Sequence, residues 1–385
     1  MREMVISLYL GAFKLIFNVC KLFPLKNKVV FLVSFTENTH FIYDQIKKDK
    51  LVITTVFLCH PRCYDGLKAT GELTYLFETK NILQTLNGIF HLATAKTIVV
   101  DNYYGFLGTV KFRDSVRCTQ IWHAAGAIKQ FGMKDPTNKD RSPQALARFK
   151  KVYQQFDQIV VGSEFMERIY EKAFLAKPSS FLRTGVPRTD FFFQDLQMEQ
   201  VRQILYEENP VFKEKKVLLY APTFRKDQVA LTELPLDLTK MYEALKEDYI
   251  LILRLHPKVR STTDFSQVYP GFVYDYSHYP TVNDLLVITD ILISDYSSIP
   301  MEFAFLRRQM IFYAYDFEEY KQANGFWEDY ECSMPGPVVK TTDMVIEALI
   351  EANFDVEKIT QFSKKWNEYS TGNASTMLVE SIFKS

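Results

Sequence analysis

The chain has 385 residues, of which 47% are hydrophobic and 15% aromatic, so it is too long for one typical core and too apolar for a disordered protein. Lys plus Arg equals Asp plus Glu at 46 each, so no net charge attracts nucleic acid and no nucleic-acid partner is predicted. The five cysteines form an odd, scattered set, which predicts reduced thiols in a cytosolic protein.

Residues 1–25, MREMVISLYLGAFKLIFNVCKLFPL, predict an amphipathic helix. Apolar residues recur there at helical spacing, whereas Lys14, Asn18 and Lys21 share the other face. No stretch is expected to be long and apolar enough to span a bilayer, so we predict that this helix lies in a membrane interface. The alternative is a helix that covers the next domain with its apolar face. Lys14 interrupts the apolar run, which argues against a signal peptide.

Residues 26–195 predict a first α/β domain. Helical patterns occur at about 40–48, 81–93 and 163–174. The runs that predict strands are 29–35, 52–59, 73–77, 97–102, 118–123, 157–163 and 180–188. This alternation predicts a parallel sheet covered by helices on both faces. Cys59, His60 and Cys63 are close enough to suggest a metal site, but no second cluster completes a four-ligand set, so we expect them to pack at a strand end.

A second α/β domain is predicted over residues 212–355, after a helix at 195–206 and a polar connection at 207–216. Its predicted strands are 217–224, 249–257, 290–294 and 310–315. Its predicted helices are 238–247, 281–288, 298–307 and 341–352. Residues 356–385 read as mostly helical, with Trp366 and Phe383 as packing anchors. Two doubly wound domains of this kind place a ligand at the carboxyl ends of their strands.

Polar residues collect at those strand ends in both halves. They are His123, Arg188, Thr223, Arg225, Arg254, His256 and the turn from Asp295 to Ser298. Their agreement in position is a stronger signal than any one motif.

Residues 289–316 read as a strand, a polar turn, a helix and a second strand. Asp295, Ser297 and Ser298 offer N-cap side chains, and Pro300 suits a first helical turn. A helix N-terminus at the carboxyl end of a strand favours an anion, so the hydroxyls suggest a bound phosphate. The alternative is an ordinary capped turn between a strand and a helix.

His123 lies in the segment QIWHAAGAIKQFG, where a strand runs into a turn of small residues. A histidine there is a candidate general base, because its ordinary pKa lies near neutrality. Ala124, Ala125 and Gly126 would let another molecule approach the backbone, and Lys129 follows closely. A structural histidine at a strand end is the alternative.

His256 lies in ILRLHPKV, where Pro257 is expected to stop the strand. Arg254 should point to the same side by the two-residue period of a strand. The pair would supply fixed hydrogen-bonding and cationic groups for a diphosphate. A solvated strand end is the alternative.

Other reaction classes lack their motifs. The chain has no GxGxxG after its first strand, no GxxxxGK[ST] and no GxSxG. It also has no Asp-x-Asp pair at a strand end to hold Mg²⁺. We therefore expect no cofactor and no required divalent ion, with a diphosphate neutralised by helix N-termini, Arg, His and Ser.

The motifs QIWHAAGAIKQFG, TGVPRTDFF, LLYAPTFR, ILRLHP and ISDYSSIPMEFAFL, in this order and spacing, resemble the CDP-glycerol glycerophosphotransferases of Gram-positive wall teichoic acid synthesis. The resemblance implies a GT-B-like fold, in which two Rossmann-type α/β domains face each other across a cleft. The first would be the acceptor-side domain and the second the donor domain for CDP-glycerol. It also implies a peripheral enzyme on the cytoplasmic face of the plasma membrane.

The resemblance implies roles for single residues. His123 corresponds to the family's proposed catalytic base, and His256 with Arg254 to the pair that steadies the leaving CMP. Glu302 falls where an acidic residue faces donor hydroxyls, whereas Lys129 and Arg225 are assigned from charge and place. The residues expected to bind substrate are Trp122, Ala124, Gly126, Lys129, Arg188, Thr223, Phe224, Arg225, Arg254, Asp295, Ser297, Ser298 and Glu302.

Ala124-Ala125-Gly126 replaces the Gly-Thr that follows the histidine in many polymerases, and the chain lacks their large N-terminal region. Both departures resemble the short primase branch. That branch adds one glycerol phosphate from CDP-glycerol to the membrane-bound acceptor ManNAc-GlcNAc-diphospho-undecaprenol.

A short polymerase, a second-step priming enzyme and a ribitol-phosphate transferase are alternatives, and a homo-oligomer is a further candidate assembly. A GT-B glycosyltransferase using a nucleotide sugar is a rival by fold, although the second half is poor in Gly. A non-catalytic lipid- or nucleotide-binding protein would need neither His123 nor His256.

Overall fold

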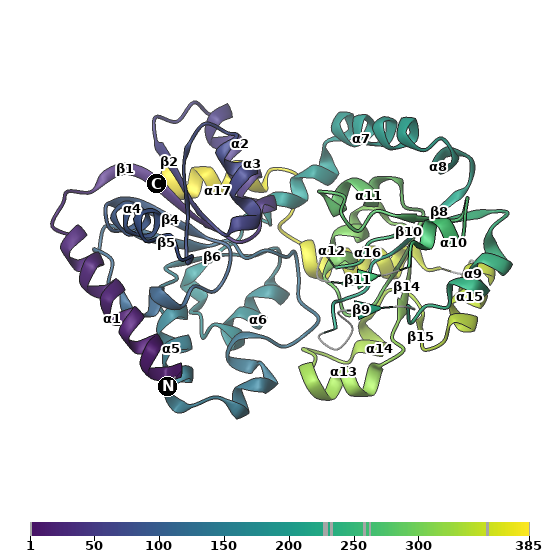
Figure 1. Ribbon diagram of the computed structural model, residues 1–385. Helices are drawn as coiled ribbons and strands as arrows, with labels where there is room; N and C mark the ends of the chain where they lie inside the picture. Colours follow the sequence, from purple (N-terminus) through teal and green to yellow (C-terminus); the bar gives the residue numbers. More distant parts are fainter. Residues whose placement is uncertain are drawn as a thin grey trace. The chain divides into compact units, whose positions relative to one another are not determined.

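A computed structural model describes residues 2–225, 230–231, 234–256, 259–261, 263–351 and 354–384. The chain forms two compact units, coloured along the sequence in Figure 1. The first comprises Met1–Ala124, Phe131–Asp190 and Glu368–Ser385, and the second comprises Ala125–Gln130 and Phe191–Asn367. After Asp190 the chain stays in the second unit as far as Asn367. The polar segment 207–216, predicted as a connection, therefore lies within that unit, at the end of α7 and in α8.

Seven strands form the sheet of the first unit within the described residues. They are β1 (Lys26–Val33), β2 (Thr54–Cys59), β3 (Leu73–Leu76), β4 (Ala95–Val100), β5 (Arg117–Gln120), β6 (Gln158–Val160) and β7 (Phe181–Leu182). Their order is β3-β2-β1-β4-β5-β6-β7 and neighbouring strands pair in parallel, for example Phe31 with Phe57 and Val99. The predicted parallel α/β sheet is confirmed.

The helices of the first unit include one from the far end of the chain. They are α1 (Arg2–Cys20), α2 (Thr36–Lys48), α3 (Pro61–Lys68), α4 (Ile82–Ala93), α5 (Pro143–Tyr153), α6 (Glu164–Ala173) and α17 (Ala374–Phe383). Leu378 and Val379 of α17 enter the core with Val29 and Ile42, and Phe383 packs against it partly buried. Helix α16 (Val356–Asn367) belongs to the second unit, so the predicted C-terminal helical segment 356–385 is divided between the units.

Helix α1 is apolar on two faces. Leu10, Phe13 and Phe17 are buried against the first unit, and the Phe13 ring stacks on Phe106 with centroids 4.6 Å apart. A second stripe stays exposed, and it consists of Met4, Val5, Leu8, Leu15 and Val19, with exposed Leu22 just after the helix. Because both faces are apolar, Glu3–Cys20 is by length and composition long enough to cross a membrane, which corrects the expectation that no stretch is.

The sheet of the second unit has six strands among the described residues. They are β8 (Lys216–Tyr220), β10 (Tyr249–Leu253), β12 (Val273–Asp275), β13 (Ile291–Ser294), β14 (Gln309–Tyr313) and β15 (Val338–Val339). Their order is β12-β10-β8-β13-β14-β15, again with parallel pairing. A separate short pair joins β9 (Ala230–Leu231) to β11 (Arg260–Ser261).

The helices of the second unit lie before, between and after the strands of this sheet in the sequence. They are α7 (Asp195–Glu208), α8 (Val211–Glu214), α9 (Leu238–Leu245), α10 (Phe265–Val268), α11 (Val282–Ile288), α12 (Ile299–Phe303), α13 (Phe317–Asn324), α14 (Tyr330–Ser333), α15 (Thr342–Glu351) and α16. Trp366 of α16 is 1% exposed, which confirms it as a packing anchor.

Several elements are shorter than predicted. Strand β7 ends at Leu182, and Gly185 then turns the chain with a φ of +79°, so the run 180–188 is not one strand. The helix expected at 298–307 is α12 followed by a 3₁₀ turn, and it ends where Arg307 adopts a φ of +54°. The sequence pattern also missed α3, α5 and α13.

Strand order reverses once in each sheet, between β1 and β4 in the first unit and between β8 and β13 in the second. In open α/β sheets, ligands bind outside the carboxyl ends of the strands at such a switch point. The residues that follow these four strands are therefore the first candidates for a functional site.

Candidate functional site

A strained turn carries His123. Strand β5 ends at Gln120, and Trp122 then adopts a φ of +51°, a left-handed conformation that is unusual for a bulky residue. The Trp122 N–H donates to Gln120 Oε1 at 2.8 Å, and its carbonyl accepts from Asn38 Nδ2 at 3.1 Å. The turn is thus held from both sides of the peptide.

The His123 imidazole lies between two aromatic rings. The Phe35 ring lies 4.2 Å from it at 16° and the Trp122 ring 4.4 Å from it at 28°, between centroids. Its Nδ1 is 3.0 Å from the backbone oxygen of Asp101. A carbonyl oxygen only accepts, so Nδ1 carries the proton and Nε2 keeps its lone pair.

Burial lowers the pKa of His123 to about 4; the hydrogen bond to the Asp101 carbonyl opposes that shift, and the nearby Arg188 charge adds to it. The ring is therefore neutral at pH 7, with an unprotonated Nε2. This is the protonation state that a general base requires.

Arg188, predicted in a strand-end set, is brought beside His123. Its Nη1 donates to the His123 carbonyl at 3.3 Å, and its own N–H donates to Asn38 Oδ1 at 3.0 Å. Asn38, at the start of α2, is 2% exposed. Its side chain forms hydrogen bonds to the backbones of both Trp122 and Arg188 and so links the two segments. Asn38, Phe35 and Asp101 were missed because each reads in the sequence as an ordinary residue at the edge of an element.

The middle of the histidine motif, Ala125–Gln130, belongs to the second unit. There a Cβ built on Gly126 would lie 2.6 Å from Trp366 Cε3 and 2.8 Å from Met301 Cγ. Side chains of the protein thus fill the space at Gly126 that was expected to admit a ligand. Burial lowers the pKa of Lys129, which the Asp295 charge opposes.

The switch point of the second unit is held by charge. Thr223 follows β8 and donates to Asp295 Oδ1 through its N–H at 2.8 Å and its hydroxyl at 2.7 Å. Arg225 is 8% exposed, and its Nη2 lies 3.0 Å from Asp295 Oδ2 while its Nε donates to Asp316 at 2.7 Å. Its Nη1 donates to the Thr223 carbonyl at 2.6 Å.

All three guanidinium nitrogens of Arg225 therefore bond to protein oxygens. This arrangement favours a positioning role for Arg225 over the predicted contact with substrate. Asp295 was expected as an N-cap and instead binds Thr223 and Arg225, which follow β8.

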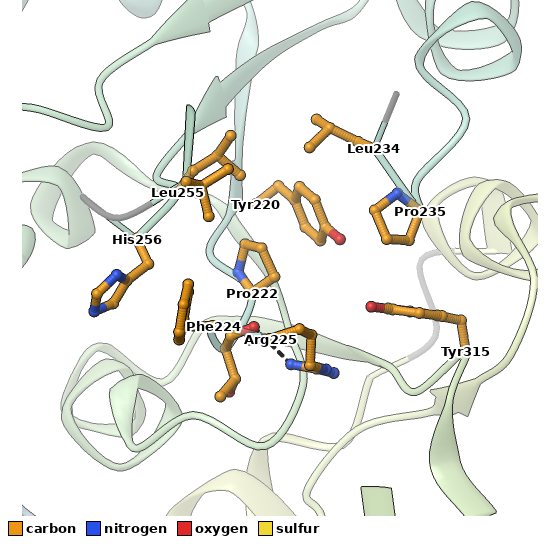
Figure 2. A pocket seen from close by; sticks show the side chains of 11 residues that line it. Tyr220, Pro222, Phe224, Arg225, Leu234, Pro235, Leu255, His256 and Tyr315 are labelled. Atoms are coloured by element: carbon orange, nitrogen blue, oxygen red, sulfur yellow. Dashed lines mark hydrogen bonds between the residues drawn. The ribbon is translucent and has the colours of Figure 1, made fainter. Parts of the chain in front are cut away.

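Figure 2 shows a small pocket beside this cluster, with the Phe224 and His256 rings next to each other at its edge. Their centroids are 4.7 Å apart. The pocket is lined by Tyr220, Pro222, Thr223, Phe224, Arg225, Leu234, Pro235, Leu255, His256, Val259 and Tyr315. The structure thus brings together four residues predicted for the functional site, and they are Thr223, Phe224, Arg225 and His256.

Arg254 is placed differently from the prediction. Strand β10 ends at Leu253, so the two-residue period of a strand does not relate Arg254 to His256. The Arg254 Nη1 donates to the carbonyls of Tyr276, at 3.3 Å, and of Ser277, which holds the segment after β12. The predicted strand stop at Pro257 lies outside the described residues.

The hydroxyl turn of the second unit lies where it was predicted, after β13. Ser297 Oγ accepts from the Ile299 N–H at 3.2 Å, and Ser298 occupies the N-cap position of α12. Glu302 on the same helix is 2% exposed. The binding roles of these three residues stay predictions.

The metal alternative gains no support from the described residues, where no group of three or more His, Cys, Asp or Glu side chains is arranged to hold an ion. Cys59 and Cys63 are both buried and lie in the apolar core of the first unit. His60 Nδ1 accepts from the Arg62 N–H at 3.4 Å at the start of α3.

Residues 15–384 match the protein family described as CDP-glycerol:poly(glycerophosphate) glycerophosphotransferase. A teichoic acid glycerol-phosphate primase of Bacillus spizizenii is 35% identical over 359 residues, which are 93% of this chain and 92% of the relative. A teichoic acid poly(glycerol phosphate) polymerase of the same organism is 30% identical over 98% of this chain and 97% of its own. The ribitol-phosphate primase of that organism is 31% identical, over 94% and 92%.

Solved structures share the fold. A histidine-to-asparagine variant of the wall teichoic acid polymerase TagF, soaked with CDPG, is similar with a TM-score of 0.80 at 23% identity, over 99% of this chain and 96% of that one. A UDP-GlcNAc 2-epimerase from Neisseria meningitidis is similar with a TM-score of 0.60 at 15% identity, over 93% and 100%. These similarities confirm the predicted α/β, GT-B-like class.

Proposed function

The chain belongs to the CDP-glycerol:poly(glycerophosphate) glycerophosphotransferase family and is an enzyme of that class, and we propose that it is a teichoic acid glycerol-phosphate primase. It would transfer sn-glycerol phosphate from CDP-glycerol to ManNAc-GlcNAc-diphospho-undecaprenol and release CMP. The observation that carries the proposal is the primase relative, which matches this chain nearly end to end at 35% identity.

His123 supports the proposed reaction through its neutral Nε2. The acceptor hydroxyl would attack the glycerol-bearing phosphorus of CDP-glycerol while its proton passes to Nε2. A new P–O bond forms to the acceptor as the bond from that phosphorus to the CMP oxygen breaks in line. Most of the rate enhancement would come from positioning and from stabilisation of the charge on the leaving CMP.

The donor would bind in the second unit. The phosphates would approach the hydroxyl turn at Ser297 and Ser298, with His256 steadying the leaving CMP and Phe224 beside it. Arg225 would act indirectly, by holding the loop after β8 to Asp295 and Asp316. The proposed route uses only side chains and backbone donors, and activity in the presence of EDTA tests whether a divalent ion is needed.

A poly(glycerol phosphate) polymerase is the second candidate. Its supporting observation is the relative of that name, which is 30% identical and of which the chain covers 97%. The length matched therefore does not separate primase from polymerase, contrary to the expectation that length favours the primase branch.

The test is CMP release from CDP-glycerol with a short-chain lipid-linked ManNAc-GlcNAc acceptor, followed by mass analysis of the product. One added glycerol phosphate supports the primase. A ladder of additions supports the polymerase instead. Transfer only from CDP-ribitol or a nucleotide sugar would overturn the proposed donor.

A membrane position is part of the proposal, because the acceptor is a lipid. Helix α4, which packs against α1, also exposes apolar side chains, and they are Ile82, Leu83 and Leu86. We expect this surface to lie in the interface on the cytoplasmic side.

Removing residues 1–24 would also strip Phe13 and Phe17 from the first unit, so a milder change tests the membrane position better. The double variant Leu8→Gln/Leu15→Gln should lose binding to phosphatidylglycerol vesicles in a flotation assay. Leu196→Gln, at an 84% exposed leucine of α7, is the matched control. Equal vesicle binding by both variants would contradict the membrane role of α1.

A further inference from the structure

Asp101 contacts His123 through its backbone and the surroundings of His123 through its side chain. It follows β4 at the switch point of the first unit and is fully buried. Its Oδ2 accepts from the N–H groups of Ser34 at 2.7 Å and Phe35 at 2.6 Å, and its Oδ1 accepts from the Tyr104 hydroxyl at 3.0 Å. Its carbonyl oxygen accepts the hydrogen bond from His123 Nδ1–H, with the nitrogen and oxygen 3.0 Å apart.

We propose that Asp101 is a positioning residue that holds His123 as the Nδ1–H tautomer, with Nε2 directed to the acceptor hydroxyl. Neutral imidazole exists in two tautomers, and only this one presents a lone pair at Nε2. The other would present a donor where a base is needed. The catalytic part of this inference rests on the proposed role of His123 as general base.

The carboxyl group of Asp101 keeps its own carbonyl and the Phe35 ring in register. Without an acceptor, the buried N–H groups after β1 would be left unsatisfied, which favours rearrangement of that turn. Phe35 is held from its other side by Arg62, whose guanidinium carbon lies 4.2 Å from the ring centroid and whose Nε donates to the Ser34 carbonyl at 2.8 Å. The plane of the His123 ring is therefore set by a neighbour that Asp101 and Arg62 fix together.

Tyr104 offers a mild way to disturb this arrangement. Its ring is buried, and its hydroxyl bonds Asp101 and, at 2.8 Å, Ser34 Oγ. Tyr104→Phe removes only that hydroxyl. Tyr43→Phe is the matched control, because the Tyr43 hydroxyl in the same unit donates to Glu72 at 3.1 Å instead.

The experiment is nitrogen NMR of the full chain with its six histidines labelled, in which the His123 signals are assigned by their loss in His123→Asn. We expect wild type and Tyr43→Phe to show the Nδ1–H tautomer. Asp101→Leu, which removes both carboxyl oxygens at similar size, should show a mixture of tautomers and a kcat lower on the order of 100-fold, with less change in KM. Tyr104→Phe should change in the same direction by less and remains informative if Asp101→Leu does not fold.

An Nε2–H tautomer in the wild type would overturn the inference. So would wild-type tautomer and kcat in both Asp101→Leu and Tyr104→Phe. The NMR measurement needs no substrate, so it separates the two proposals. The expected tautomers together with no transfer from CDP-glycerol would overturn the proposed function and leave the positioning role supported.

Discussion

The two switch points use one device with different partners. In each unit, strand order reverses between two neighbouring strands, and an aspartate follows the later one, β4 or β13. This aspartate accepts hydrogen bonds from backbone N–H groups in the turn after the earlier one, β1 or β8. Asp101 does so in the first unit, and Asp295 does so for Thr223 in the second. The other partner of Asp101 is the hydroxyl of Tyr104, whereas that of Asp295 is the guanidinium of Arg225.

This difference separates two kinds of chemistry. In the first unit, burial raises the pKa of Asp101 to about 7, which its hydrogen bonds from Phe35, Ser34 and Tyr104 oppose, and burial lowers that of His123 to about 4. Such surroundings favour neutral groups and suit proton transfer. The second unit concentrates fixed charges, which suit the neighbourhood of a diphosphate.

The largest effect is expected on kcat, in a variant of His123 that leaves the stability of the fold unchanged. His123→Asn keeps a side-chain donor for the Asp101 carbonyl but removes the base, so kcat should fall by about 10²- to 10⁴-fold. The melting temperature should change little. His278→Asn, at an exposed histidine of the second unit, is the control. Full CMP release by His123→Asn would remove its assigned role.

Replacement of Arg225 should lower the free energy of unfolding, whereas replacement of His123 should not. Arg225→Met leaves the Asp295 and Asp316 carboxylates without their shared partner, and breaking a buried ion pair costs about 3–5 kcal/mol. Urea denaturation of the full chain measures this loss. Lys240→Met breaks an exposed, solvent-screened pair with Asp343 and should leave the free energy of unfolding nearly unchanged. Equal losses in the two variants would contradict the anchoring role of Arg225.

A smaller effect tests the packing of the histidine motif in the second unit. In Gly126→Ala the added methyl group meets Trp366 and Met301, and overpacking of this kind costs about 1–3 kcal/mol. Gly66→Ala adds a methyl group to α3 with nothing within 4 Å and should be neutral or slightly stabilising. Denaturation curves give both values. A Gly126→Ala protein as stable as wild type would return this glycine to a ligand-binding role.

The gentlest test titrates His123 without changing any residue. Because its pKa is lowered to about 4, the neutral ring should persist as the pH falls from 7.5 to 5.5. A histidine with an ordinary pKa of about 6.5 would become mostly protonated over that range. NMR of the labelled ring follows the change directly. Protonation near pH 6.5 would show that the ring is not held in the neutral form.

The sequence predicted the sheets and the two groups of polar strand ends, because β-branched runs and parallel topology determine where carboxyl ends meet. It did not predict where each strand stops. Asp101 was read as part of the strand 97–102, although β4 ends at Val100. The partner of Arg225, Asp316, lies 91 residues farther along the chain, so no local pattern indicates their contact.

Gly126 illustrates the same limit in the opposite direction. A small residue in a turn has one sequence signature whether a ligand or the protein fills the space beside it. Here the space is filled by Trp366, whose position depends on the fold of the whole second unit.

The chain passes between its two units four times, after residues 124, 130, 190 and 367. No single cut therefore yields either unit complete. A fragment that ends at Asp190 lacks α17. The Asp190 carboxylate accepts hydrogen bonds from the first two N–H groups of that helix, each at 2.8 Å. Gene fusion could therefore not exchange one unit alone. A change of acceptor or donor specificity would have to arise by substitutions in a chain that keeps both units.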